Sequence, residues 1–270
     1  MRYETLPDGA PIPVLGLGTW QFGGESTADT SRDGEFVDTL QQLMAMGYTH
    51  IDTAEGYAQG HAEELVGMAM RDMPRGDLFI TTKVSPSHLR YDDVFRSIDG
   101  SLQRLRTDYV DMYLIHWPSH DIPLEEAFRA LNQLVADGRA RRIGVSNFDV
   151  PLMQCSVELC ATPLATNQVL YNLLRRETAE NGVLAFCQEH GILFTAYSPL
   201  KHDVLNHPEV KAIAAAHDVS PAQVALAWVV RQPRVITIPK SANLKHAADN
   251  IAALSLDLTE DDVRRLDAIA

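Results

Sequence analysis

Residues 48–57 read Y-T-H-I-D-T-A-E-G-Y, a short apolar run that ends in an aspartate and is followed five residues later by a tyrosine. β-type residues such as Ile51 predict a buried strand that ends at Asp52. A buried carboxylate is costly unless another group pairs with it. We therefore expect a positively charged partner for Asp52 on a neighbouring strand, close to Tyr57.

Runs of the same kind recur along the chain, and their continuous rather than alternating hydrophobicity is typical of parallel strands covered by helices. Eight such runs are present, at residues 13–20, 48–54, 78–84, 110–117, 141–147, 166–172, 192–200 and 235–241. Amphipathic helical patterns lie between them, at residues 36–44, 94–105 and 124–135 among others. Eight strand–helix units predict an α/β fold, a (β/α)8 TIM barrel that forms a single domain over residues 1–270.

Local signals agree with this alternation. Three glycines stand where left-handed helix C-caps are expected, at Gly47, Gly138 and Gly191. Ser220 before Pro221, and Thr259 three residues before Asp262, predict helix N-termini. The opening Y-E-T-L-P-D-G-A-P-I-P-V (3–14) predicts a β-hairpin that closes the bottom of the barrel. No strand is followed by G-x-G-x-x-G, which disfavours a Rossmann fold.

The charge balance limits the partners. With 23 basic and 36 acidic residues, the net charge of −13 argues against nucleic acid or an anionic membrane, and favours a small molecule bound by a local basic cluster. No secretory signal or membrane-spanning run is visible, since the apolar stretch at 224–230 is too short. Cys155, Cys160 and Cys187 form no C-x-x-C motif and predict buried thiols. We expect a cytoplasmic monomer.

Three consecutive predicted strands end in chemically active side chains: Asp52, Lys83 and His116, with Tyr57 on the loop after the first of them. The active sites of TIM barrels lie at these strand ends. Each residue alone is more often structural, as an N-cap, a packing residue or a surface charge; the four together predict catalysis. An ammonium beside the phenol lowers its pKa and eases proton transfer, the carboxylate fixes the ammonium, and the imidazole orients a carbonyl oxygen.

Two further polar groups stand at later strand ends. Lys240 and Ser241, with Lys201, Lys245 and His246 near them, predict a phosphate site after the eighth strand, although a solvated loop explains them equally well. Ser146, Asn147, Asn167 and Gln168 offer groups for a carboxamide, or bind local backbone instead. Motifs for metal hydrolysis, nucleotide hydrolysis and serine esterases are absent, and no metal is expected.

These residues resemble the aldo-keto reductase superfamily over nearly the whole chain. The matching segments are LGLGTW (15–20), HIDTAEGY (50–57), TTKV (81–84), LIHWP (114–118), GVSNF (144–148), NQVLYN (167–172), AYSPL (196–200) and IPKS (238–241). The resemblance implies an oxidoreductase that reduces small aldehydes or ketones with NADPH, with NADH as the alternative cofactor and Tyr57 as proton donor. It is strongest for bacterial members similar to 2,5-diketo-gluconate and methylglyoxal reductases.

The resemblance also implies a set of binding residues. The cofactor contacts would be Gly18, Thr19, Ser146, Asn147, Gln168, Tyr197, Ser198, Leu200, Lys240, Ser241, His246 and Asn250, and the substrate pocket would include Trp20 and Trp117. Within this set Tyr197 would stack on the nicotinamide, Lys240 and Ser241 would bind the 2′-phosphate of NADP, and Asn250 would contact adenine.

Three departures from the family pattern qualify these expectations. His246 stands where the family often has an arginine, so we expect a weaker preference for NADP. The loop after His116 is short, and few residues follow the last predicted helix, so we expect an open pocket.

Two other functions remain as alternatives. Lys83 would be the nucleophile of a Schiff-base aldolase, but a paired Asp52 keeps it charged and therefore unreactive. The chain would otherwise be a non-catalytic regulatory or structural member of the same superfamily.

Overall fold

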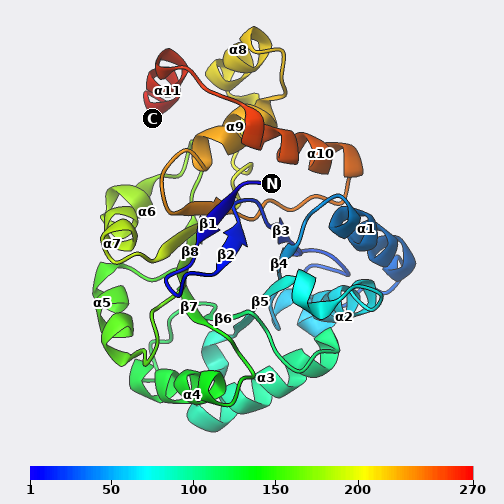
Figure 1. Ribbon diagram of the computed structural model, residues 1–270, viewed down its shortest axis with the longest axis vertical. Coiled ribbons are helices and arrows are strands. Elements are labelled where there is room, and N and C mark those ends of the chain that lie inside the picture. The colour runs from blue at the N-terminus through cyan, green and yellow to red at the C-terminus, as the bar shows by residue number, and fades with distance from the viewer. Residues whose placement is uncertain (270) are drawn as a thin grey trace.

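The computed structural model, which describes residues 1–269, has a ring of eight parallel strands inside a ring of helices (Figure 1). The strands are β3 (Leu17–Gly18), β4 (His50–Asp52), β5 (Phe79–Val84), β6 (Met112–Ile115), β7 (Ile143–Ser146), β8 (Thr166–Leu170), β9 (Leu193–Tyr197) and β10 (Val235–Thr237). They lie side by side in chain order. Gly16 donates to the Thr237 carbonyl at 2.8 Å, so the first and last strands meet. The predicted (β/α)8 barrel is confirmed, and every strand lies within a predicted run.

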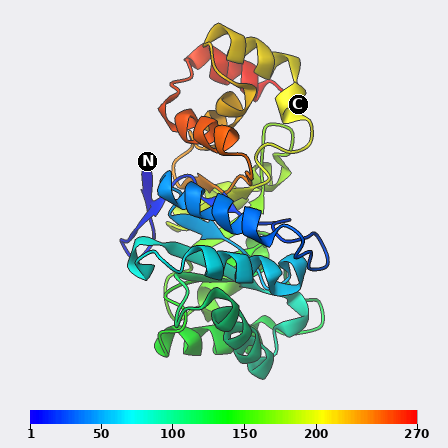
Figure 2. The same cartoon turned by 90° about the vertical axis from the view of Figure 1, so that its right-hand side faces the viewer.

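The predicted hairpin is also present. Strands β1 (Tyr3–Thr5) and β2 (Pro11–Pro13) pair antiparallel, and Figure 2 shows them at the left of the barrel. Arg234 donates to the Thr5 carbonyl at 2.7 Å, and Arg142 pairs with Asp8 at 2.6 Å. These arginines precede β10 and β7, so the hairpin covers the N-terminal, bottom end of the strands.

The helices cover the outside of the barrel. They are α1 (Asp33–Ala45), α2 (His61–Ala69), α3 (Tyr91–Leu105), α4 (Leu124–Ala136), α5 (Val150–Leu159), α6 (Glu177–Glu180), α7 (Val183–Glu189), α8 (Pro208–Ala216), α9 (Pro221–Val229), α10 (Leu244–Ala252) and α11 (Glu260–Asp267). Short 3₁₀ turns are η1 (Tyr57–Gly60), η2 (Arg75–Asp77), η3 (Pro86–His88), η4 (Val204–Asn206) and η5 (Ala253–Ser255).

The helix ends follow the sequence signals. Ser220 and Gln223 form a reciprocal capping box at the start of α9, and Thr259 and Asp262 form another at the start of α11. Gly47, Gly138 and Gly191 all have positive φ, as predicted for left-handed C-caps. These caps turn the chain from each helix into the next strand, so the C-terminal ends of the strands all point to one side of the barrel.

The prediction of three buried thiols was wrong for two of them. Cys187 is buried, but Cys160 is only partly buried and Cys155 is exposed on α5, because this helix buries little more than Met153 and Ser156. No helix among the described residues is both long and apolar enough to cross a membrane.

Candidate active site

The partner that Asp52 requires is Lys83. The Lys83 ammonium lies 2.6 Å from Asp52 Oδ1 and also donates to the Thr53 carbonyl at 2.8 Å. Gln168 donates to the second Asp52 oxygen at 2.8 Å. The side chains of Lys83 and Asp52 are 0% and 1% exposed, so the pair is isolated from solvent.

This pair fixes the charge of the lysine. Burial alone would lower the pKa of Lys83, but the Asp52 carboxylate and the Tyr57 hydroxyl raise it above its ordinary value. Burial raises the pKa of Asp52, against the lowering effects of Lys83 and Gln168. A buried ion pair persists when its remaining hydrogen-bonding capacity is satisfied, and here Thr53 and Gln168 provide the additional contacts.

Tyr57 completes the predicted arrangement, with its hydroxyl 3.3 Å from the Lys83 ammonium. Burial raises the pKa of Tyr57 above its ordinary value, and Lys83 acts in the opposite direction. The sequence-based expectation of a net lowering was therefore wrong for this structure, because desolvation of the phenolate outweighs the nearby ammonium. Tyr57 is a neutral phenol at neutral pH, which is the form that donates a proton.

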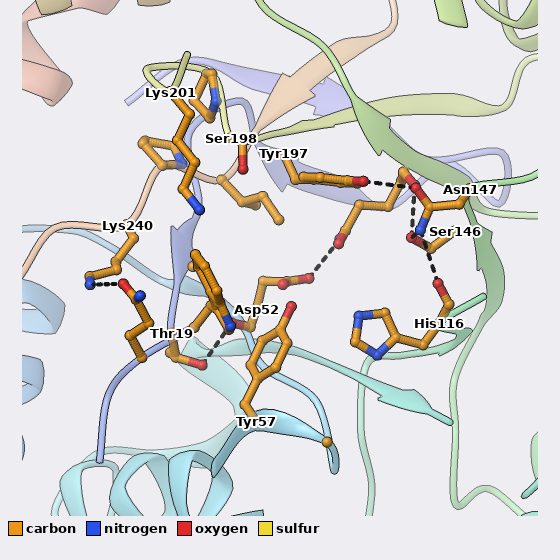
Figure 3. Close-up of a pocket in the computed structure, with 18 of the residues that line it drawn as sticks. Thr19, Asp52, Tyr57, His116, Ser146, Asn147, Tyr197, Ser198, Lys201 and Lys240 are labelled. Carbon is orange, nitrogen blue, oxygen red and sulfur yellow. Dashed lines mark hydrogen bonds between the residues drawn. The ribbon is translucent and has the colours of Figure 1, made fainter. Parts of the chain in front are cut away.

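His116 faces Tyr57, with ring centroids 5.6 Å apart in an edge-on arrangement. Burial, with a smaller effect of Lys83, lowers the pKa of His116 to about 3. The ring is therefore neutral at physiological pH and carries one N–H donor. Asn147 donates to the His116 carbonyl at 3.1 Å and accepts from the Tyr197 hydroxyl at 2.9 Å, which connects these strand ends (Figure 3).

A cavity of about 690 Å³ opens above these groups at the C-terminal end of the barrel. The predicted residues that line it are Gly18, Thr19, Trp20, Asp52, Tyr57, His116, Trp117, Ser146, Asn147, Gln168, Tyr197, Ser198, Leu200 and Lys240. They come from strands far apart in sequence, so the barrel gathers in one place what the sequence distributes over more than 200 residues. A cavity of this size accommodates a small-molecule ligand or cofactor.

Other predicted site residues lie outside the lining of this cavity. Lys83 lies beneath Tyr57, which it contacts directly. Ser241 donates to the Asn243 carbonyl at 2.8 Å. His246 is exposed in the first turn of α10, where its N–H donates to Asn243 Oδ1 at 3.2 Å. Asn250 is 2% exposed on the same helix.

Sequence reasoning missed Gln21 as a lining residue and gave Lys201 no specific role. Lys201 places its ammonium 3.6 Å from the centroid of the Trp20 ring, and Lys240 donates to Gln21 at 2.8 Å (Figure 3). Both contacts join the loop after β3 to later loops across the cavity mouth. The remaining unpredicted lining residues are Gly56, Pro199, Ile238 and Pro239. The available signal for Lys201 was its position beside the A-Y-S-P-L segment.

Several residues in and beside the cavity have a strained backbone. Gln21, Asn147 and Ser198, which line it, have φ of 71°, 64° and 54°, and Ala58 and Gln59 after Tyr57 have φ of 48° and 57°. Left-handed conformations at non-glycine residues cost on the order of 1–3 kcal/mol each and persist when surrounding contacts enforce them. Such strain is common at functional sites.

No group of three or more His, Cys, Asp and Glu side chains within residues 1–269 is arranged to hold a metal ion. Beside Asp52, Tyr57 and His116, the polar groups that face the cavity include amides, a hydroxyl and two ammonium groups, at Asn147, Gln168, Ser146, Lys201 and Lys240. These donors suit an organic ligand that carries a carboxamide and anionic groups.

Comparison with known proteins gives the same picture. The model of the Aldo/keto reductase family matches residues 14–270. Methylglyoxal reductase YeaE of Escherichia coli K12 is 40% identical over 266 residues, covering 95% of this chain and 90% of that protein. Methylglyoxal reductase DkgB of Escherichia coli O157:H7 is 36% identical over 264 residues, covering 96% and 93%.

Solved structures agree. The thermostable aldo-keto reductase Tm1743, in complex with epalrestat, superposes with a TM-score of 0.97 at 45% identity and covers 100% of both chains. An aldo-keto reductase from Klebsiella pneumoniae in complex with NADPH gives 0.90 at 39% identity, covering 99% of this chain and 95% of that one. With a family model spanning almost the whole sequence and the barrel and strand-end residues in place, the chain belongs to the aldo/keto reductase family.

Proposed function

We propose that the protein reduces small aldehydes and ketones to alcohols with NADPH, and that its substrates include 2-oxoaldehydes such as methylglyoxal. The observation that carries the proposal is the Asp52–Lys83–Tyr57 chain of contacts, of 2.6 and 3.3 Å, which ends at the floor of the cavity. The two Escherichia coli relatives are methylglyoxal reductases, and the Klebsiella pneumoniae relative binds NADPH.

The cavity fits the proposed cofactor. Ser146, Asn147 and Gln168 offer the hydroxyl and amide groups that bind a carboxamide, and the Tyr197 ring lies beside them. Lys240, and Lys201 from the loop after the neighbouring strand β9, supply positive charge where a chain of net charge −13 must bind phosphates. When bound, the nicotinamide supplies the hydride that reduces the carbonyl carbon.

The protein's own residues supply the proton. Tyr57 donates its phenolic proton to the carbonyl oxygen as the alkoxide forms, and the Lys83 ammonium stabilises the phenolate left behind. Asp52 holds Lys83 in place. The neutral His116 ring donates its N–H to the same carbonyl oxygen and so orients the substrate.

The walls of the cavity favour small substrates with broad selectivity. Trp20 and Trp117 form aromatic walls near Tyr57 and His116, and Trp117 is 49% exposed, so the mouth is open on that side. Open aromatic walls discriminate weakly among small carbonyl compounds, because they offer few directional contacts.

The Schiff-base alternative requires a neutral Lys83 in contact with substrate. Lys83 is instead an ammonium with 0% exposure that lies beneath Tyr57 and is paired with Asp52. A lysine in this state neither attacks nor reaches a carbonyl in the cavity, so the geometry opposes an aldolase.

Oxidation of NADPH by the purified protein with methylglyoxal, small aldehydes and keto sugars tests the proposal, with the alcohol product identified by NMR. We expect oxidation that requires both protein and carbonyl. Failure to form an alcohol from any of these carbonyls would overturn the proposed function.

A further inference from the structure

Tyr57 is followed by a turn that its sequence does not favour. Ala58, Gln59 and Gly60 are consecutive left-handed residues, with φ of 48°, 57° and 92°. Glycine adopts this conformation easily, but alanine and glutamine do not, because their Cβ atoms crowd the backbone. Ala58 is also completely buried. The turn that aims Tyr57 at the cavity must therefore be held by contacts from elsewhere in the fold.

Arg104, near the end of α3, makes the contact that holds this turn. A Cβ atom added at Gly60 would lie 2.6 Å from Arg104 Nε, so the side chain of Arg104 rests directly on the backbone of the turn. The same Nε donates at 2.7 Å to Glu63, a carboxylate with 0% exposure in the first turn of α2. Arg104 thus holds both the turn and the helix that follows it.

Glu63 connects this helix to the strand that carries Lys83. Its other oxygen accepts a hydrogen bond from the hydroxyl of Thr82, the residue before Lys83 in β5. Neighbouring residues of a strand point to opposite faces, so Thr82 faces the helices while Lys83 faces the barrel interior. Glu63 therefore ties α2 to the backbone position adjacent to Lys83.

A second carboxylate attaches the other side of Tyr57 to the same segment. Glu55 accepts from the Ser85 N–H at 2.7 Å and lies 2.9 Å from His88 Nδ1. Ser85 directly follows β5. Tyr57 thus lies in the sequence between Glu55 and Glu63. Each of these carboxylates accepts a hydrogen bond from a residue within two positions of Lys83, Ser85 for Glu55 and Thr82 for Glu63.

We propose that Arg104 and Glu63 are positioning residues that hold the strained turn and thereby keep Tyr57 within hydrogen-bond reach of Lys83. The inference rests on the proposed role of Tyr57 as proton donor. Neither residue lines the cavity that contains Tyr57. Their loss should consequently affect proton transfer more than the binding of substrate or cofactor.

The test compares Arg104→Met with Arg96→Met in the full-length protein. Arg96 is a matched control because it also belongs to α3 and pairs with a carboxylate, Asp93, but forms no hydrogen bond or ion pair with the turn. We expect Arg104→Met to lower kcat at least about tenfold, the effect of a misplaced catalytic group, with KM and the NADPH dissociation constant changed less than about twofold. The basic limb of its pH–rate profile should move to higher pH, because Tyr57 loses part of the stabilisation by Lys83.

A rescue variant separates positioning from simple loss of stability. Gln59 is exposed and left-handed, and asparagine adopts this conformation more readily than glutamine. When Gln59→Asn is added to Arg104→Met, the double variant should recover a substantial part of the lost kcat. If Arg104→Met fails to fold, Arg104→Lys takes its place in the same comparison. Gln59→Asn alone should leave kcat unchanged.

The outcomes separate this inference from the proposed function. Absence of alcohol formation by the unmodified protein would overturn the proposed function, and full activity in Tyr57→Phe would overturn the role of Tyr57 as proton donor on which the inference rests. If Tyr57→Phe is inactive but Arg104→Met matches Arg96→Met in kcat and pH profile, the positioning inference is wrong. The same conclusion follows if the kcat lost in Arg104→Met, or in Arg104→Lys, is not recovered by Gln59→Asn.

Discussion

Lys83 and Asp52 form an ion pair of 2.6 Å in which neither side chain is more than 1% exposed. Burying two charged side chains this deeply costs desolvation free energy, and two hydrophobic residues at the same positions would avoid that cost. The Lys83 ammonium also contacts the Tyr57 hydroxyl. We infer that the pair is kept for its effect on Tyr57 rather than for stability.

Lys83→Met should therefore affect both activity and stability. Without the ammonium, the pKa of Tyr57 rises further, because Lys83 is the main group that lowers it. We expect kcat to fall at least about tenfold and the basic limb of the pH–rate profile to shift upward. Asp52 is left unpaired, so the free energy of unfolding should fall by about 3–5 kcal/mol. Lys211→Met on the exposed face of α8 is the control; an unshifted pH profile in Lys83→Met would contradict the electrostatic role.

Tyr57→Phe removes the proton donor and leaves the rest of the cavity in place. General acid catalysis contributes typically 10²–10⁴-fold, so kcat should fall by at least about 10²-fold. The dissociation constant for NADPH, measured by fluorescence quenching, should hardly change. Near wild-type kcat in this variant would show that another group donates the proton.

Much of this arrangement was predictable from sequence. Parallel strands that are buried on both faces read as continuous apolar runs, and the residue that ends each run lies at the mouth of the barrel. For this reason Asp52, Lys83 and His116 were placed correctly in space. Lys201 was predicted only as a neighbour of the phosphate site, because its contact with Trp20, 181 residues earlier in the chain, has no local signal.

The net electrostatic effect was also beyond sequence reasoning. The presence of Lys83 beside Tyr57 predicts a lowered pKa for the tyrosine. The net direction of the shift depends on how deeply Tyr57 is buried, and burial is a property of the assembled barrel. Similarly, the left-handed turn after Tyr57 contradicts the local preferences of Ala58 and Gln59. Only the tertiary contacts of Arg104 reveal what holds it.

Lys201→Met should weaken cofactor binding without selecting between cofactors. Methionine keeps an apolar stem over Trp20 but removes the ammonium that crosses the cavity mouth. NADPH and NADH share the pyrophosphate, so we expect both dissociation constants to rise by a similar factor, on the order of tenfold for one charge-assisted contact. Lys240→Met is the matched comparison and should weaken NADPH more than NADH. Selective loss of NADPH in Lys201→Met would place Lys201 at the 2′-phosphate instead.

Acid should destabilise the protein through its buried histidines. Burial, with a smaller effect of Lys83, lowers the pKa of His50 to about 3, from an ordinary value of 6.5. Because the pKa of His50 is lower in the folded state, the unfolded state binds the proton first as the pH falls. The contribution of neutral His50 to the free energy of unfolding is therefore complete above pH 6.5 and is lost as the pH drops from 6.5 toward 3. His50→Gln should make this decline shallower in urea unfolding experiments. An equal slope in both proteins would show that other groups dominate acid unfolding.

The residue at position 246 affects the preference of the protein for NADPH over NADH. His246 is exposed in the first turn of α10, near Lys245 and a short distance along the chain from Lys240. An imidazole cannot bind a phosphate in the bidentate manner of a guanidinium, so His246 holds a 2′-phosphate less well than an arginine would. We expect NADPH to be preferred over NADH, and this preference to shrink as salt screens the site.

His246→Arg should strengthen the preference. A guanidinium is always charged and binds phosphate in a bidentate manner, so NADPH should bind more tightly by on the order of 1–2 kcal/mol. NADH lacks the 2′-phosphate, and its dissociation constant should stay nearly constant. Lys245→Arg is the control, because it places a guanidinium on the same helix turn without changing the charge. Equal tightening of both cofactors by His246→Arg, or of neither, would show that position 246 does not face the 2′-phosphate.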